Sequence, residues 1–379
     1  MIRCILWKIC RFLYVYTAKP LLFLMSPDKV HSSTIRFAAM VGSVSFMRWF
    51  VRLIFKGRRD GRLVQNYHGV EFERPVGLAA GFDKNGEIVP VISALGFGFG
   101  TVGSVTAQRC AGNPRPWFYR LLKTKSLVVN AGLANQGSRA IIERLRKYSP
   151  KSIQYFPIVL SIAKSNSQKV VNIKDSINDY VTTVKRAKNE SSIKMIELNI
   201  SCPNAYGGEP FTTPGRLEQL LAAVDKVGIT QPIYVKMPVD LSWVEFKKLL
   251  DVIVEHNIAG VTIANLAKDR AKIELKDELP NNIRGNLSGK PTFELSNELI
   301  RQTYLNYGDK LTIIGVGGIF SAENAYIKIR LGASLVEIIT GMIFCGPQLA
   351  AEINDGLVQL LERDGYTNIS QAIGVDVTD

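Results

Sequence analysis

The sequence predicts an α/β protein: a closed (β/α)8 TIM barrel with a small N-terminal helical extension. The chain has 379 residues, which suits a barrel of about 250 residues with additional elements. Hydrophobic residues make up 46% of it, enough for a large core. Beyond residue 70, short apolar runs alternate with helix-like stretches. This is the pattern of repeated β/α units.

The apolar runs are continuous, as expected of strands that are buried on both faces of a parallel sheet. They occupy residues 76–80, 98–104, 157–163, 195–201, 232–237, 260–265, 311–317 and 335–341. The segment 242–256 between two of them is amphipathic, which predicts a helix packed on the sheet. Eight such units favour a closed barrel, and an open doubly wound sheet is the alternative.

We expect the chain to divide into an extension over residues 1–65, a barrel over 66–365 and a tail over 366–379. We expect Pro20 and the Ser26-Pro27-Asp28 stretch to separate an entry helix from a second helix that begins at Pro27. Cations interrupt the first 25 residues, so the longest uncharged run is about seven residues. That is far short of the ~20 residues that span a bilayer.

The composition of this entry segment predicts a helix that lies in a membrane interface, since apolar and aromatic residues alternate with cations. No small-residue cleavage site follows it, so a secretory signal is not expected. A helix packed on its own domain and a mitochondrial presequence are the alternatives.

The net charge is +14, which suits an anionic partner such as nucleic acid, a membrane surface or an acidic small molecule. No ladder of cations and aromatics marks a nucleic-acid face. Cations are dense near the start of the chain, which favours the membrane. The five cysteines are scattered without a CxxC pair, so neither a metal site nor a disulfide framework is expected.

Polar residues stand where the apolar runs end, and barrel enzymes carry their chemistry at those ends. The segment GLAAGFDKNGE (77–87) combines small residues with Lys84, and ELNISCPNAYGG (197–208) places Asn199 and Asn204 on either side of Cys202. Amides can bind the edges of an imide-like ring, and a cysteine can act as a general base. A tight turn with a solvated lysine and a buried structural cysteine are the alternatives.

Lys236 ends another run, where a buried lysine needs an anionic or electron-rich partner such as a flavin ring. Asn265 is a further candidate for the ring edge. The last two runs end in Gly317-Gly318 and Thr340-Gly341, a position where barrels commonly bind phosphate. A GxGxxG fingerprint after the first run is absent, so a Rossmann NAD site is not expected.

These residues resemble those of the dihydroorotate dehydrogenases over about residues 27–350. The shared motifs are GLAAGFDKNGE, GNPRP (112–116), NISCPN (199–204), NLSGKP (286–291), IIGVGGI (313–319) and TGMIFCGP (340–347). The resemblance implies an FMN-dependent barrel that oxidises dihydroorotate to orotate in pyrimidine synthesis. It implies Cys202 as the base that removes the C5 proton while hydride passes from C6 to the flavin.

The resemblance also assigns binding residues. The substrate would be bound by Lys84, Asn130, Asn199, Asn204 and Asn265. The FMN would be bound by Ala80, Gly81, Lys84, Ser104, Ser161, Asn199, Lys236, Gly289, Gly317, Gly318, Thr340 and Gly341.

The segment MSPDKVHSSTI (25–35) resembles the membrane-associated class that uses quinone, whose N-terminal helices form a tunnel to the flavin. His31 and Arg120 match positions in that tunnel. A quinone acceptor and the cytoplasmic face of a bacterial inner membrane are therefore expected, with the mitochondrial inner membrane as the alternative.

Three features depart from that class. Cys202 stands where serine is usual, as in the soluble class. Val129 occupies the position of a substrate-binding asparagine, and Asn130 follows one residue late. Ser161, Ala264 and Ile339 replace asparagine, threonine and tyrosine near the flavin. These departures keep open another acceptor (fumarate) or another dihydropyrimidine, while a dihydrouridine synthase-like RNA enzyme and a non-catalytic membrane module are weaker alternatives.

Overall fold

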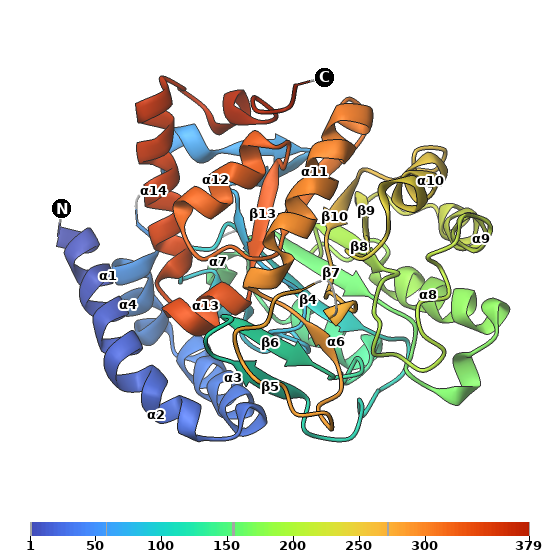
Figure 1. Cartoon of the computed structure of the whole chain (residues 1–379), viewed down its shortest axis with the longest axis horizontal. Coiled ribbons are helices and arrows are strands. Elements are labelled where there is room, and N and C mark those ends of the chain that lie inside the picture. The colour runs from blue at the N-terminus through green and yellow to red at the C-terminus, as the bar shows by residue number, and fades with distance from the viewer. Residues whose placement is uncertain (1, 58, 154–155, 271–272, 379) are drawn as a thin grey trace.

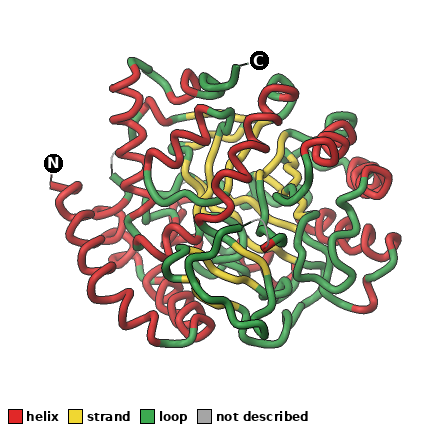
Figure 2. The backbone as a smooth tube through the Cα atoms, viewed as in Figure 1, coloured by secondary structure: helices red, strands yellow, loops and turns green. Residues whose placement is uncertain are grey.

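The computed structural model describes residues 2–57, 59–153, 156–270 and 273–378 and confirms the closed barrel. Eight parallel strands form the ring, and each pairs with the next along the chain. Figure 2 shows these strands at the centre with helices around them. They are β3 (Val76–Leu78), β4 (Phe99–Val105), β7 (Ile158–Ile162), β8 (Met195–Asn199), β9 (Ile233–Lys236), β10 (Gly260–Ile263), β12 (Thr312–Val316) and β13 (Leu335–Ile338).

Every strand of the barrel coincides with one of the predicted apolar runs. Seven lie within the expected bounds, and β4 continues one residue further. Several strands end before the polar residues that close the runs, because those residues leave the sheet to form loops. The polar ends therefore gather at one mouth of the barrel.

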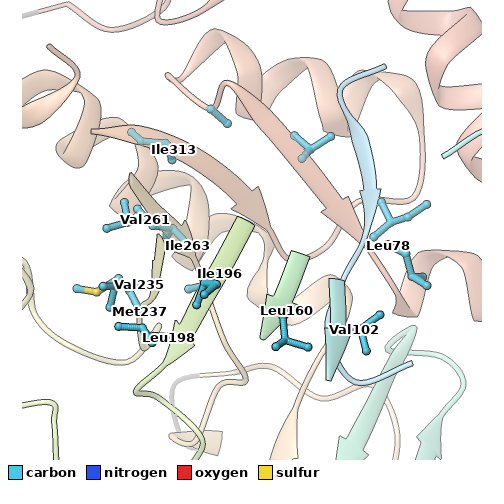
Figure 3. Packing of buried hydrophobic residues seen from close by; sticks show 14 of the residues in the cluster. Leu78, Val102, Leu160, Ile196, Leu198, Val235, Met237, Val261, Ile263 and Ile313 are labelled. Carbon is cyan, nitrogen blue, oxygen red and sulfur yellow. The ribbon is translucent and has the colours of Figure 1, made fainter. Parts of the chain in front are cut away.

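Helices cover the outside of the barrel, and outward-facing apolar side chains of the strands pack against them (Figure 3). The helix predicted over 242–256 is α10 (Trp243–Ile253), which begins with a capping box between Ser242 and Glu245. The other helices of the barrel are α5 (Val89–Ile92), α6 (Ser138–Arg146), α7 (Pro150–Ile153), α8 (Ile173–Ala187), α9 (Pro214–Asp225), α11 (Phe293–Tyr307), α12 (Ala322–Arg330), α13 (Thr340–Cys345) and α14 (Leu349–Asp364).

Two small sheets cover the barrel, and neither was predicted. The hairpin of β1 (Gln65–Tyr67) and β2 (Val70–Phe72) packs against one end of the barrel, where the ring of Phe72 meets that of Phe99. At the other mouth, β5 (Phe118–Leu121), β6 (Ser126–Val129) and β11 (Asn286–Leu287) form an antiparallel sheet. Runs this short carry little periodicity, and β11 is far from its partner in the sequence.

The N-terminal extension is helical, as predicted, but it is divided differently. It comprises α1 (Ile2–Leu13), a π-helical stretch (Tyr14–Ala18), α2 (Lys19–Leu24), α3 (Pro27–Ser43) and α4 (Ser45–Phe55). Helix α3 begins at Pro27 as expected. The break predicted at Pro20 is wrong, because this proline lies in the first turn of α2, where its missing N–H needs no acceptor.

The extension lies beside α13 and α14 (Figure 1). Arg11 forms an ion pair with Glu352 of α14, and the Tyr14 hydroxyl donates to the Ile343 carbonyl at 2.7 Å. Among the described residues no single helix is long and apolar enough to span a membrane. Helices α3 and α4 taken together have the length and composition of a membrane span, but the chain bends by 104° between them. The segment 366–379, expected as a tail, includes a 3-10 turn (Ile369–Ala372) whose Ile369 side chain is buried.

Candidate active site

The core of the candidate site is a buried hydrogen-bond network at the mouth where the strands end. Asn199, the last residue of β8, donates from Nδ2 to Ser104 Oγ at 2.8 Å. Ser104 Oγ lies 2.8 Å from Ser161 Oγ on β7. All three side chains are buried. The structure thus joins three predicted cofactor-binding residues into one polar floor.

Lys236, at the end of β9, is buried beside this floor. Its Nζ lies 3.9 Å from Oε1 of Glu197, which is also buried inside the barrel. Glu337 of β13 accepts a hydrogen bond from Thr101 in the same interior. Burial, together with the Glu197 carboxylate, raises the pKa of Glu337. Two buried carboxyl groups therefore share one lysine, and Glu337 holds its proton at neutral pH.

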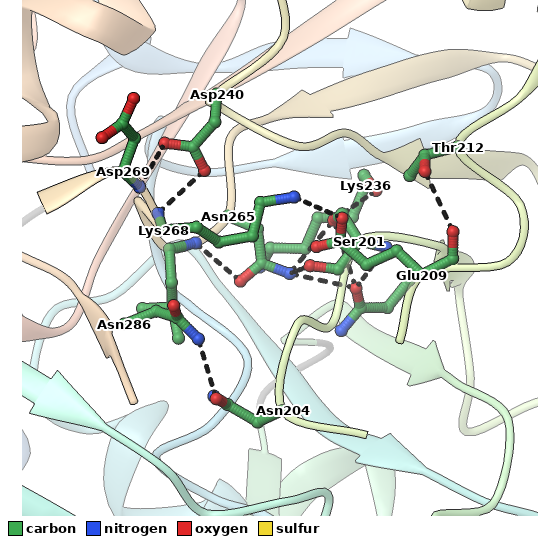
Figure 4. Close-up of polar contacts among 12 residues, drawn as sticks. Ser201, Asn204, Glu209, Thr212, Lys236, Asp240, Asn265, Lys268, Asp269 and Asn286 are labelled. Carbon is green, nitrogen blue, oxygen red and sulfur yellow. Dashed lines mark hydrogen bonds and ion pairs between the residues drawn. The ribbon is translucent and has the colours of Figure 1, made fainter. Parts of the chain in front are cut away.

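Asn265, just after β10, connects the floor to the loop that follows β8 (Figure 4). Its Nδ2 donates to Asn199 Oδ1 at 3.1 Å and to the Ser201 carbonyl at 2.8 Å. The hydroxyl of Ser201 donates to the Lys236 carbonyl at 2.8 Å. These contacts fix the start of the loop that carries Cys202 and Asn204.

A second group of amides lies under the β5–β6–β11 sheet. Asn204 donates to the Val129 carbonyl at 2.9 Å, and its Oδ1 accepts from Asn286 at 2.8 Å. Asn113 donates to Asn130 Oδ1 at 2.9 Å and to the Asn204 carbonyl at 3.0 Å. Asn130 therefore belongs to this group of amides, although Val129 occupies the position where the family has asparagine. Val129 contributes its backbone carbonyl, which accepts from Asn204.

Cys202 lies between these two polar groups and is half-buried. Burial raises the pKa of its thiol to about 11, and the nearby Lys164 opposes this shift. The thiol is thus protonated at neutral pH in the free protein. The environment of Cys202 thus moves the pKa of its thiol in the opposite direction from the one that a base needs.

Lys84 links the barrel to the extension. Its Nζ donates to the Gly81 carbonyl at 2.8 Å and lies 3.2 Å from Nε2 of His31 on α3. Burial lowers the pKa of Lys84 to about 8, and burial with the nearby Lys84 charge lowers the pKa of His31 to about 3. His31 is therefore neutral, and its ring meets those of Phe82 and Phe118 edge-on.

Arg120 of β5 holds the end of α2. Its guanidinium lies 4.3 Å from the centre of the Phe23 ring and donates to the carbonyls of Phe23 and Met25. The two residues predicted for a tunnel, His31 and Arg120, thus both lie where the extension meets the barrel.

The glycine turns that follow β11, β12 and β13 are pressed together. A Cβ on Gly318 would lie 2.4 Å from Phe293 Cβ, and one on Gly341 would lie 2.0 Å from the Ile319 carbonyl oxygen. Gly289 has a φ of +81°, and a Cβ there would lie 2.7 Å from Thr340 Cγ2. Thr340 Oγ1 lies 2.8 Å from Ser288 Oγ. Helix α13 begins at Thr340 beside this junction, and its first N–H groups have no acceptors inside the helix.

The residues present fit a flavin mononucleotide. The glycine turns and the start of α13 provide backbone donors for a phosphate. The polar floor provides donors and acceptors for a ring edge. A Cβ on Gly81 would meet only Ile339 Cδ1, at 3.8 Å, so the backbone beside Ala80 is not covered as closely as the glycine turns are.

Several polar residues of the site were not among the predicted ones. Asn113 and Asn286 stand in motifs that we noted, GNPRP and NLSGKP, but we assigned them no role. Ser288 belongs to the second motif as well. Asn166, which donates to Asn113 Oδ1 at 3.0 Å, follows β7 outside any motif. Its place four residues beyond a strand end was the available signal.

Comparisons with known proteins agree with the resemblance of the motifs. A family model described as dihydroorotate dehydrogenase matches residues 62–361. A protein from Haloarcula marismortui named dihydroorotate dehydrogenase (quinone) is 35% identical over 366 residues, which cover 95% of this chain and 98% of that protein. One of the same name from Nostoc punctiforme is 33% identical over 376 residues, with 96% and 98% covered.

Solved structures agree too. The crystal structure of DHODH from Eimeria tenella in complex with ferulenol is 29% identical, with a TM-score of 0.82, and the match covers 92% of this chain and 95% of that one. The fold, the family model and the two relatives together show that this chain belongs to the dihydroorotate dehydrogenase family.

Proposed function

We propose that this protein oxidises dihydroorotate to orotate with FMN as its flavin and a quinone as its electron acceptor, in the synthesis of pyrimidines. Membership of the family implies a flavin cofactor. The observation that carries the proposal is the arrangement at one mouth of the barrel. Amide groups and Lys84 lie there beside a glycine-lined junction, and His31 of the extension contacts Lys84.

FMN would be held at its two ends. Gly289, Gly317, Gly318, Thr340 and Gly341 would surround the phosphate, where short side chains let the backbone approach. Ala80, Gly81, Ser104, Ser161, Asn199, Lys84 and Lys236 would surround the ring. When bound, the flavin accepts the hydride that leaves C6 of dihydroorotate.

Dihydroorotate is a carboxylate attached to an imide-like ring, and the residues at the barrel mouth suit both parts. The Lys84 ammonium would pair with the carboxylate, a charge-assisted contact in a largely buried place. Asn130, Asn199, Asn204 and Asn265 would bind the ring, since each amide has donors and an acceptor.

Cys202 would remove the proton from C5 of the substrate, so that the C5–C6 double bond forms as hydride leaves C6. Because burial raises the pKa of the thiol, the reactive thiolate is scarce at neutral pH. Lys164 offsets the burial in part, and the base must give up its proton before each reaction. A rate that rises with pH is expected from such a base.

The quinone would reach the flavin between the extension and the barrel, past His31 and Arg120. The extension is suited to a membrane surface because large apolar side chains on it are exposed. They include Phe12, Tyr16, Leu21, Leu24, Phe37, Phe46, Trp49 and Phe50. Cations beside them would bind anionic headgroups. We place the protein on the cytoplasmic face of a bacterial inner membrane, with the mitochondrial inner membrane as the alternative.

The test is anaerobic mixing of the purified yellow protein with dihydroorotate while the absorbance of the oxidised flavin is followed. Rapid bleaching, with the colour restored by an added quinone, is the expected result. Restoration by fumarate instead would identify the soluble type of acceptor, which Cys202 favours. Colour without bleaching would refute dihydroorotate as the substrate and point to the shift at Val129 and Asn130.

A further inference from the structure

Lys328 on α12 is a fully buried lysine that the mechanism above does not use. Its stem lies against β12, where a Cβ on Gly315 would be 3.3 Å from Lys328 Cδ. Its Nζ donates to Ser296 Oγ at 2.6 Å and to Asn297 Oδ1 at 2.8 Å. The ammonium also lies 4.9 Å from the centre of the Phe293 ring.

All of these partners are neutral. Among the described residues no carboxylate forms an ion pair with Lys328. Glu294, exposed on α11, is the charged group that acts on it from a distance, and burial lowers the pKa of Lys328 to about 7. A buried ammonium without a counter-charge is costly to a fold, so burial favours the neutral amine. An anion bound nearby would favour the ammonium form again.

The partners of Lys328 are also the residues behind the glycine turn. A Cβ on Gly317 would lie 3.1 Å from Ser296 Oγ, and one on Gly318 would lie 2.4 Å from Phe293 Cβ. The side chain of Ser296 therefore separates the Lys328 ammonium from the turn that we assign to the flavin phosphate. Ser296 between them is buried, so the charge is screened less there than it would be at the surface.

We propose that Lys328 is a positioning residue that supplies the positive charge for the flavin phosphate from behind the Gly317-Gly318 turn, and so makes the site select a phosphorylated flavin. This inference rests on the proposed function, since the phosphate must lie at that turn. Lys328 does not touch the phosphate. It offsets the negative charge through the buried layer formed by Phe293 and Ser296.

The test compares FMN with riboflavin, which has the same ring and lacks the phosphate. Holoenzyme is freed of flavin, and the rebinding of each flavin is followed by fluorescence quenching. The variant is Lys328→Met, which keeps the length of the side chain and removes its charge. The matched control is Lys248→Met, which removes an exposed lysine from α10.

We expect Lys328→Met to weaken FMN binding at least about tenfold and to change riboflavin binding less than about twofold. The flavin-free variant should melt no lower than the flavin-free wild type, because an unpaired buried charge is gone. Parallel losses for both flavins, or unchanged FMN binding, would overturn the role of Lys328. If the wild type itself did not prefer FMN over riboflavin, the phosphate site in the proposed function would be wrong instead.

Discussion

The two carboxyl groups inside the barrel, Glu197 and Glu337, allow us to predict how Glu337→Gln changes the stability of the protein at each pH. Glu337 is buried, and its pKa rises from 4.5 to about 8 on folding, chiefly through burial. The unfolded chain therefore loses this proton at lower pH than the folded one does. Stability falls by about 1.4 kcal/mol per pH unit between the two pKa values. At pH 7, which is 2.5 units above the lower of the two pKa values, the cost is between about 3 and 4 kcal/mol.

Glutamine is neutral at every pH and can still accept the hydrogen bond from Thr101. Glu337→Gln should therefore melt higher than the wild type by several degrees at pH 8 and by little at pH 5. The assay is thermal unfolding of the holoenzyme, followed by circular dichroism between pH 5 and pH 8. Glu197→Gln is the matched comparison, since it leaves Glu337 as the counter-charge of Lys236 and so lowers the pKa of Glu337.

A melting temperature of Glu337→Gln that runs parallel to the wild type across this pH range would refute the reasoning. It would mean that Glu337 is ionised in the folded barrel. A large loss of stability at every pH would mean instead that the amide cannot replace the acid in this space.

Three further predictions concern the site. Cys202→Ala should keep the flavin but slow its reduction by dihydroorotate by at least about a hundredfold. In the wild type, the rate of flavin reduction should rise from pH 6 to pH 9 because the pKa of the thiol is raised. A stopped-flow rate that does not change with pH would remove Cys202 as the base. Gly341→Ala should abolish flavin binding, since its Cβ would lie 2.0 Å from the Ile319 carbonyl; a yellow variant with normal absorbance would contradict this. Deleting residues 1–60 should slow quinone reduction while dihydroorotate still bleaches the flavin; unchanged quinone turnover would exclude the extension from the acceptor path.

The eight strands could be read from the sequence because strands buried on both faces are continuous apolar runs, a local signal that needs no knowledge of partners. Their polar ends, such as Asn199 and Lys236, could be read for the same reason. The small sheet over the mouth could not, because Asn286 pairs with Val129 from a two-residue strand. Asn113 and Asn286, which join the predicted Asn130 and Asn204 beside that sheet, were missed with it.

The sequence by itself determined the barrel, the family and most of the residues at its mouth, because these follow from local patterns and motifs. Tertiary structure alone decided the electrostatics. Lys328 lies on a short helix where a lysine would ordinarily face solvent, yet it is buried behind the glycine turn. The pKa values of Cys202, His31 and Glu337 move because packing excludes water from them, and exclusion of water depends on neighbours that are distant in the chain.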